Sequence, residues 1–218
     1  MKQPPEDIKL VIFDVDGTLV DAYQAIADSI NYMMVKMGLP PQSLQTVTRS
    51  VGHGVEGLVS CFIEEARTAE ALRIFRTHHD RRLRQKLRIM PGARALLAAL
   101  QKRGCRMAIA SNRPEQFCRI ILEQLKLDKY FDWIICGDMV KNPKPHPEIL
   151  RVILRAAGVK AGQAVYVGDM TVDVLCGRRA RVFTLALPTG SSTRAELQAL
   201  KPDRIIPGLS KVLSIFPC

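Results

Sequence analysis

The stretch Leu10-Val11-Ile12-Phe13-Asp14-Val15-Asp16-Gly17-Thr18-Leu19 decides how this chain folds. It is an apolar run that ends in two carboxylates one residue apart, followed by a glycine. Such a run predicts a buried parallel strand, and ligands bind at the carboxyl ends of strands in open parallel sheets. Burying charge costs free energy unless the charge has a partner or a function. We therefore expect Asp14 and Asp16 to face one cleft, one as nucleophile or metal ligand and the other as acid or base.

Two other structures would use the same residue types as this stretch. The pattern Asp-x-Asp-Gly also opens calcium-binding loops, but here Leu19 stands where such a loop needs glycine and Ala25 where it needs glutamate. A plain surface turn would also use Asp and Gly, but the preceding run is too apolar for an edge strand. Both alternatives are disfavoured.

The composition is that of an ordinary globular domain with one core. The chain has 218 residues, 47% of them hydrophobic and 24% charged. No apolar run approaches the roughly 18 residues that span a bilayer, and the first residues show no signal-peptide pattern. The six cysteines are scattered without a C-x-x-C pair, which indicates isolated thiols rather than a disulfide framework. We expect a cytoplasmic protein that contacts no membrane.

The net charge is +11, with basic residues concentrated between Arg73 and Arg106. This excess favours anionic partners. Three explanations account for the excess of basic residues: a solvated, arginine-rich helix face, an electrostatic field that steers small anions, and nucleic-acid binding. Aromatic residues make up only 6% of the chain and no nucleic-acid motif is present, which argues against nucleic acid.

The pattern of apolar residues changes at Pro91-Gly92. Before it, residues 22–87 show the three- and four-residue spacing of helices; after it, helical segments alternate with short apolar runs. We expect helices at 93–102, 115–125, 147–157, 172–179 and 194–200, and strands at 107–110, 133–136, 164–167 and 182–186. This alternation predicts an α/β fold, a Rossmann-like parallel sheet formed by residues 1–20 and 90–218, with a small all-helical cap at 21–89 inserted after the first strand.

Three further strand ends carry polar groups suited to an anion or a metal. Ser111 and Asn112 precede a proline at a predicted helix start, where they could simply cap the helix or bind phosphate. Lys144 lies between two prolines, so its ammonium would be held rigidly, although a solvated loop lysine is the alternative. Asp169 and Asp173 are four residues apart, so both could face one side of a helix. They could complement the helix dipole or bind Mg²⁺.

Together these segments resemble the haloacid dehalogenase superfamily of phosphohydrolases. The resemblance rests on Asp14-x-Asp16-Gly17-Thr18-Leu19, on Ser111-Asn112, on Lys144 before Pro145 and on Gly168-Asp169-x-x-x-Asp173, in the family's order. It implies that Asp14 attacks phosphorus and that Asp16, oriented by Thr18, acts as acid and base. It also implies that Ser111, the Asn112 backbone and Lys144 bind the phosphoryl oxygens.

The resemblance implies a Mg²⁺ cofactor as well. Asp14, the backbone carbonyl of Asp16 and Asp169 would hold the ion, with Asp173 in support. The segment from Arg49 to Val59 looks like the cap loop of phosphoglycolate phosphatases, so Arg49 and His53 are candidates for contacts with the substrate. Residues 176–181, Cys-Gly-Arg-Arg-Ala-Arg, depart from the small residues that close relatives often carry after the fourth motif, so the identity of the substrate stays open.

The reaction implied is hydrolysis of a small anionic phosphate monoester, with 2-phosphoglycolate as the leading substrate. A carboxylate at Asp16 favours phosphoryl transfer over carbon–halogen cleavage in this family. The alternatives are a phosphosugar mutase, a nucleic-acid end phosphatase suggested by charge alone, and a catalytically silent binding or regulatory protein. Isomer formation would identify the mutase, and absence of turnover the silent protein. The sequence leaves the oligomeric state open.

Overall fold

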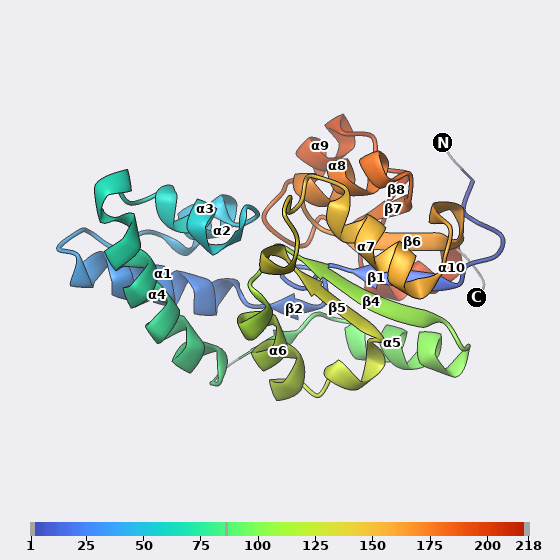
Figure 1. Ribbon diagram of the computed structural model, residues 1–218, viewed down its shortest axis with the longest axis horizontal. Coiled ribbons are helices and arrows are strands. Elements are labelled where there is room, and N and C mark those ends of the chain that lie inside the picture. The colour runs from blue at the N-terminus through green and yellow to red at the C-terminus, as the bar shows by residue number, and fades with distance from the viewer. Residues whose placement is uncertain (1–2, 86, 216–218) are drawn as a thin grey trace.

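The first strand, β1 (Leu10–Phe13), lies at the centre of a six-stranded sheet in which every pair of neighbours is parallel (Figure 1). The computed structural model describes residues 3–85 and 87–215. The strand order is β5-β4-β1-β6-β7-β8. The other strands are β4 (Arg106–Ser111), β5 (Trp133–Cys136), β6 (Ala164–Gly168), β7 (Phe183–Ala186) and β8 (Arg204–Ile205). All four β1 residues are fully buried, as a central strand covered on both faces requires.

Alternate residues of β1 belong to two different apolar layers. Val11 and Phe13 pack in one core with α5 (Ala93–Lys102) and α6 (Glu115–Gln124). Leu10 and Ile12 pack in the other with α7 (Glu148–Ala157) and α8 (Thr171–Ala180). Because side chains alternate across a strand, a run that is apolar at every position is covered on both sides. The result is a three-layer α/β fold, so the expected fold class is confirmed.

Residues 21–89, which we call the cap segment, form helices that lie beside the sheet in Figure 1. They are α1 (Tyr23–Lys36), α2 (Leu44–Ser50), α3 (Gly54–Ser60), the short η1 (Glu65–Arg67) and α4 (Thr68–Leu83). α1 packs along α4, and their apolar faces continue the core that contains α5 and α6. Two short antiparallel strands, β2 (Val20–Asp21) and β3 (Arg88–Ile89), pair at the two ends of the segment. Its independence as a domain stays a prediction.

The expected helices and strands occur within a few residues of their predicted bounds, with some additions. The strand β8 was not expected, because two residues are too few to show a period. The remaining elements are η2 (Asp128–Tyr130), η3 (Gly137–Met139), η4 (Ala161–Gln163), α9 (Arg194–Ala199), η5 (Leu209–Lys211) and α10 (Val212–Ile215). Cys218, one of the six cysteines, lies outside the described residues.

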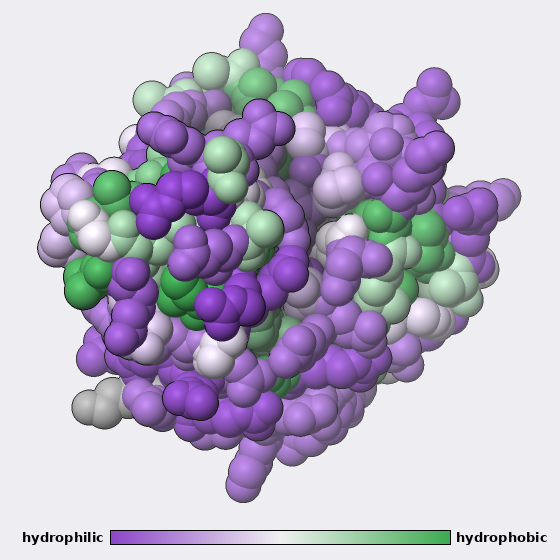
Figure 2. Space-filling model, turned by 60° about the vertical axis from the view of Figure 1, so that its left-hand side comes forward, coloured by the Kyte–Doolittle hydropathy of each residue, from purple (hydrophilic) through white to green (hydrophobic). Residues whose placement is uncertain are grey.

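The surface carries few large apolar side chains. The face in Figure 2 is mostly hydrophilic, with hydrophobic residues in scattered groups. Among the residues that the structure describes, the exposed large hydrophobic ones are Tyr32, Val35, Leu44 and Met139. Within residues 3–85 and 87–215, no helix combines the length and the apolar character needed to cross a membrane.

Gly177 allows α8 to approach β7 closely, and this gives a test of the fold. A Cβ at this position would collide with the Oγ1 of buried Thr184. In a helix interior, Ala is favoured over Gly by about 1 kcal/mol, but overpacking costs about 1–3 kcal/mol. We expect Gly177→Ala to lower the free energy of unfolding, measured by urea denaturation. Gly162→Ala, where nothing lies within 4 Å of the added Cβ, is the control. Equal stabilities of the two variants would contradict the packing described.

Candidate active site

The candidate site lies where β1, β4 and β6 end, at one edge of the sheet. Asp14 follows β1, Ser111 ends β4 and Asp169 follows β6. Lys144 comes from the proline-containing loop between β5 and α7, and Asp173 from the first turn of α8. Residues far apart in the sequence therefore meet because parallel strands end at the same edge.

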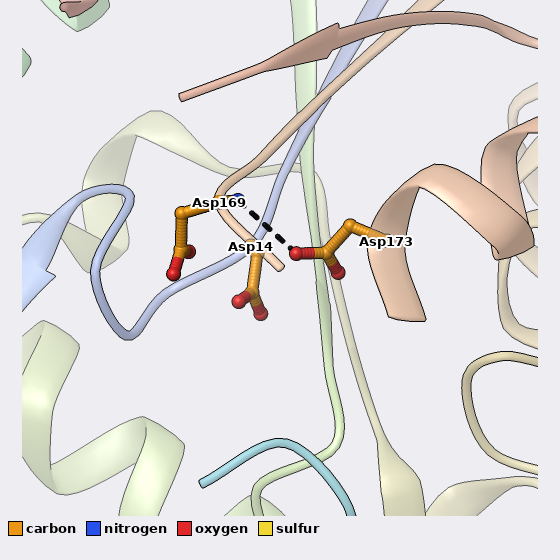
Figure 3. A group of neighbouring side chains, drawn as sticks. All are labelled: Asp14, Asp169 and Asp173. Carbon is orange, nitrogen blue, oxygen red and sulfur yellow. Dashed lines mark hydrogen bonds between the residues drawn. The ribbon is translucent and has the colours of Figure 1, made fainter. Parts of the chain in front are cut away.

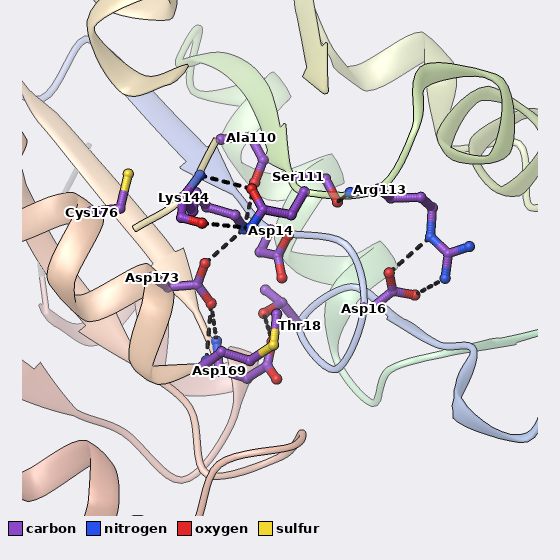
Figure 4. Close-up of polar contacts among 12 residues, drawn as sticks. Asp14, Asp16, Thr18, Ala110, Ser111, Arg113, Lys144, Asp169, Asp173 and Cys176 are labelled. Atoms are coloured by element: carbon purple, nitrogen blue, oxygen red, sulfur yellow. Dashed lines mark hydrogen bonds and ion pairs between the residues drawn. The ribbon is translucent and has the colours of Figure 1, made fainter. Parts of the chain in front are cut away.

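The ammonium of Lys144 is buried between two carboxylates (Figure 4). Its Nζ lies 2.9 Å from Oδ1 of Asp14 and 2.7 Å from Oδ1 of Asp173. It also lies 3.1 Å from the Ala110 carbonyl and 3.1 Å from the Tyr166 hydroxyl. Burial opposes the charge, but the two carboxylates outweigh it and raise the pKa of Lys144. The alternative of a solvated loop lysine is therefore wrong.

Asp14 has one occupied and one free oxygen. Oδ1 accepts from Lys144, whereas Oδ2 is buried and has no hydrogen-bond partner among the described residues. Burial raises the pKa of Asp14 to about 7, against the opposing effect of Lys144. A buried oxygen without a partner is costly unless a ligand or an ion completes the site.

Both oxygens of the Asp173 carboxylate accept hydrogen bonds from other groups of the protein. Oδ1 accepts from Lys144 and from the Tyr166 hydroxyl at 2.7 Å. Oδ2 accepts from the backbone N–H groups of Asp169 at 3.1 Å and Met170 at 2.9 Å, at the start of α8. This arrangement suits a residue that orients the Asp169 loop and Lys144 rather than one that binds an ion directly.

Asp169 is held by hydroxyl groups and enclosed by glycines. Its Oδ1 accepts from Thr18 at 2.7 Å and its Oδ2 from Tyr23 at 3.2 Å. A side chain at Gly17 or Gly190 would collide with its carboxylate, so both positions require glycine. The Thr18 hydroxyl therefore contacts Asp169 and not Asp16, which corrects the expectation that it orients Asp16. Tyr23, on the first turn of α1, was not among the predicted residues.

Asp14 and Asp169, supported by Asp173, form a carboxylate cluster that fits a magnesium ion (Figure 3). One carboxylate oxygen from each lies within 4.8 Å of the others, and all three residues are buried. Oxygen ligands without His or Cys suit Mg²⁺. With Asp16, the site holds four carboxyl groups, and among the described residues Lys144 and Arg113 are the cations paired with them. Burial raises the pKa of Asp14 and of Asp169, so a divalent cation would favour their ionised forms, and the unpartnered oxygen of Asp14 is available to bind it.

Asp16 makes a bidentate ion pair with Arg113. The Nε of Arg113 donates to Oδ2 at 2.9 Å and Nη2 to Oδ1 at 2.7 Å, with both residues buried. Arg113 was not among the predicted site residues, because an arginine at a helix start gives no distinct pattern. Its position directly after Ser111-Asn112 at a strand end was the available signal.

The pocket above Asp14 is partly covered by the cap segment. One wall comes from the sheet edge and the other from helices α1, α3 and α4 with the loop before α3. The lining is mainly apolar apart from the sheet edge and His79. The residues that line it are Asp14, Asp16, Ile26, Val51, Gly52, Gly54, Val55, Leu58, Phe75, His79, Ser111, Asn112, Arg113 and Met170.

Ser111 and Asn112 both line this pocket, with different uses of their side chains. Ser111 Oγ accepts from the backbone N–H of Arg113 at 3.2 Å, which leaves its O–H to donate to a ligand. Asn112 Oδ1 accepts from the N–H of Lys144 at 2.9 Å, and its Nδ2 donates to the carbonyls of Lys144 and Gly52, both at 2.8 Å. The Asn112 side chain thus connects the lysine loop to the cap segment. Phosphate binding by its backbone stays a prediction.

Arg49 and His53 do not line the pocket around Asp14. They line a neighbouring groove between the cap segment and the region of α9. The Nη1 of Arg49 donates to Ser191 O at 2.6 Å and Glu196 Oε2 at 2.9 Å, and Nη2 completes the ion pair. Arg49 lowers the pKa of Glu196 to about 2. In this structure the guanidinium joins the cap segment to the core. Its contact with a substrate carboxylate stays a prediction.

His79 connects Arg113 to the cap segment. Ser29 Oγ donates to Ala25 O at 2.8 Å, so the Nδ1–H of His79 donates to Ser29 Oγ at 3.0 Å. This leaves Nε2 of His79 to accept from Nη1 of Arg113 at 2.8 Å. Burial and the neighbouring guanidinium place the pKa of His79 well below its ordinary value, so the ring is neutral.

Comparisons with known proteins place the chain in a family. Residues 11–187 match the family described as haloacid dehalogenase-like hydrolase, and the chain belongs to it. It is 34% identical, over 94% of its length and 78% of the relative's, to a phosphoglycolate phosphatase of Pseudomonas fluorescens. It is 32% identical to phosphoglycolate phosphatase 1 of Pseudomonas aeruginosa, over 96% of this chain and 79% of that one.

The fold agrees with these sequence matches. The crystal structure of a predicted phosphoglycolate phosphatase from Haemophilus somnus superposes with a TM-score of 0.90. The two chains share 26% identity, and the match covers 95% of this chain and 97% of that one. The expected membership of the haloacid dehalogenase family is confirmed.

Neutral, buried His79 predicts a pH dependence of stability. Below pH 6.5 the unfolded chain binds a proton at His79 that the folded chain does not, so acidification favours unfolding. We expect His79→Gln to make the fall in unfolding free energy between pH 6.5 and 5 shallower, by at most about 1.4 kcal/mol per pH unit. Urea denaturation at several pH values measures this slope, and His53→Gln, at an exposed position, is the control. Parallel slopes for wild type and His79→Gln would contradict the prediction.

The carboxylate cluster predicts that Mg²⁺ stabilises the fold. At a concentration 100-fold above its Kd, Mg²⁺ should raise the free energy of unfolding by about 2.7 kcal/mol, a Tm increase of several degrees. Asp169→Asn should remove most of this increase, whereas Asp128→Asn, at an exposed position, should retain it. Thermal unfolding with Mg²⁺ or with EDTA measures the effect. An equal Tm increase in Asp169→Asn and wild type would remove Asp169 from the metal site.

Proposed function

We propose that this protein is a Mg²⁺-dependent phosphatase that hydrolyses a small phosphate monoester through a covalent intermediate on Asp14. The observation that carries the proposal is Asp14 itself, a buried carboxylate with one oxygen on Lys144 and the other without a partner among the described residues, beside Asp16 in a pocket between the sheet edge and the cap segment. Relatives named phosphoglycolate phosphatase, at up to 34% identity, support 2-phosphoglycolate as the leading substrate. A cytoplasmic location is part of the proposal.

In the first step Asp14 attacks phosphorus. A bond forms between a carboxylate oxygen and phosphorus, while the bond from phosphorus to the ester oxygen breaks. Asp16 gives a proton to the departing oxygen, and the product alcohol leaves. In the second step Asp16 takes a proton from water, whose oxygen attacks phosphorus and releases Asp14 and inorganic phosphate.

Positive charge and hydrogen-bond donors around Asp14 make this attack possible. Lys144 and the Ser111 hydroxyl would hold phosphoryl oxygens as negative charge develops on them. Bound by Asp14, Asp169 and the backbone carbonyl of Asp16, Mg²⁺ would reduce the repulsion between the carboxylate and the phosphate. The apolar side chains of Val55, Leu58 and Phe75 line the pocket on the side of the cap segment and would limit the access of water to the phosphoryl group.

Replacing the nucleophile tests the proposal directly. Asp14→Asn keeps the shape of the side chain but removes the attacking charge, so phosphate release should fall by roughly 10⁴-fold or more. Asp16→Asn should reduce turnover by roughly 10²–10⁴-fold, because proton transfer is lost in both steps. The measurement is phosphate released from a panel of monoesters including 2-phosphoglycolate, with Mg²⁺ or EDTA. Asp128→Asn is the control, and near-native turnover by Asp14→Asn would refute its role.

A further inference from the structure

Arg113 is the one cation among the described residues that line the pocket above Asp14. The others that carry charge are Asp14 and Asp16, and His79 is neutral. Lys144, which the proposed function assigns to the phosphoryl group, is not among the lining residues and is paired with Asp14 and Asp173. A substrate with a second anionic group, besides its phosphoryl group, therefore meets a single buried guanidinium in this pocket.

The contacts of Arg113 leave it able to bind such a group. Nε and Nη2 donate to Asp16, and Nη1 donates to His79. These contacts use three of the five N–H donors of a guanidinium, which leaves two. The contact with His79, whose ring is held by Ser29, keeps the guanidinium at the pocket when its other partners change.

Asp16 and a substrate carboxylate present the same chemistry to Arg113. The planar fork of a guanidinium matches either carboxylate in a bidentate pair. In the structure Arg113 holds both oxygens of Asp16 (Figure 4). While this ion pair persists, the Asp16 side chain cannot turn toward a leaving-group oxygen. A ligand that binds Arg113 in place of Asp16 frees the Asp16 side chain to turn.

We propose that Arg113 determines substrate specificity by exchanging its ion pair with Asp16 for one with a carboxylate of the substrate. This inference rests on the proposed phosphatase function. It assigns the carboxylate of a substrate such as 2-phosphoglycolate to Arg113 and not to Arg49, whose guanidinium is paired with Glu196. A phosphate ester without a second anion leaves Arg113 on Asp16 and is a poor substrate in kcat as well as in KM.

Two esters of nearly equal size separate recognition of the carboxylate from recognition of the phosphoryl group. They are 2-phosphoglycolate and 2-hydroxyethyl phosphate, in which a hydroxymethyl group replaces the carboxylate. Steady-state kinetics with Mg²⁺ would be measured for wild type, Arg113→Lys and Arg113→Gln. Arg119→Gln, at an exposed position of α6 and paired with Glu115, is the matched control.

For wild type we expect kcat for 2-hydroxyethyl phosphate to be at least tenfold lower than for 2-phosphoglycolate. In Arg113→Gln the ratio of the two kcat/KM values should fall by roughly 10- to 100-fold, as expected for loss of a charged hydrogen-bonded pair. The kcat/KM ratio of Arg113→Lys should lie between those of wild type and Arg113→Gln, because lysine keeps the charge but lacks the planar fork of the guanidinium. Loss of a purely structural contact would lower kcat/KM for both substrates by the same factor and leave their ratio unchanged.

The outcomes distinguish this inference from the function on which it rests. If wild type releases phosphate from neither ester nor from the wider panel, the phosphatase proposal fails and this inference fails with it. If wild type hydrolyses both esters with equal kcat, specificity through Arg113 is refuted while the phosphatase function stands. That measurement needs no variant, so a folding defect in Arg113→Gln cannot obscure the result. An unchanged kcat/KM ratio in folded Arg113→Lys and Arg113→Gln would also refute it.

Discussion

The buried ammonium of Lys144, shared between Asp14 and Asp173, is the interaction on which the rest of the site depends. Removing one partner from a buried ion pair costs about 3–5 kcal/mol, because the remaining charge loses its compensation. The surroundings serve this ammonium: Tyr166 and the Ala110 carbonyl complete its hydrogen bonds, and Asn112 fixes its backbone. A mobile surface lysine could not hold a nucleophile in place. Lys144 is buried and held by several partners, so it fixes the position of Asp14.

The same constraint explains why the site favours a divalent ion. Burial is the main cause that raises the pKa of Asp14 to about 7, and the neighbouring carboxylates of Asp173 and Asp16 add to this effect. A cation bound beside its free oxygen would offset both the burial and the like charges. The site therefore concentrates carboxyl groups where the proposed Mg²⁺ would bind, and this concentration lowers stability when the ion is not bound.

Much of this could be predicted from the sequence, and the reasons for the rest are physical. The run before Asp14 and the alternation after Pro91-Gly92 indicate the parallel sheet, because burial on both faces leaves a strong local pattern. The interaction of Thr18 with Asp169, 151 residues away, and the pairing of Arg113 with Asp16 have no such pattern. Side chains that meet only after folding are specified by topology, so the sequence identified which strand ends matter but not which side chains pair there.

The position of β1 in the sheet has a consequence for synthesis on the ribosome. β1 is made first, yet both of its neighbours come much later: β4 starts at residue 106 and β6 at residue 164. Until residue 168 has left the ribosome, a completely apolar strand has at most one of its two partners. The helices of residues 23–83, made in the interval, carry apolar faces that belong to the same core as Val11 and Phe13. The inserted helices can thus shelter the nascent strand from aggregation before they ever cover a substrate.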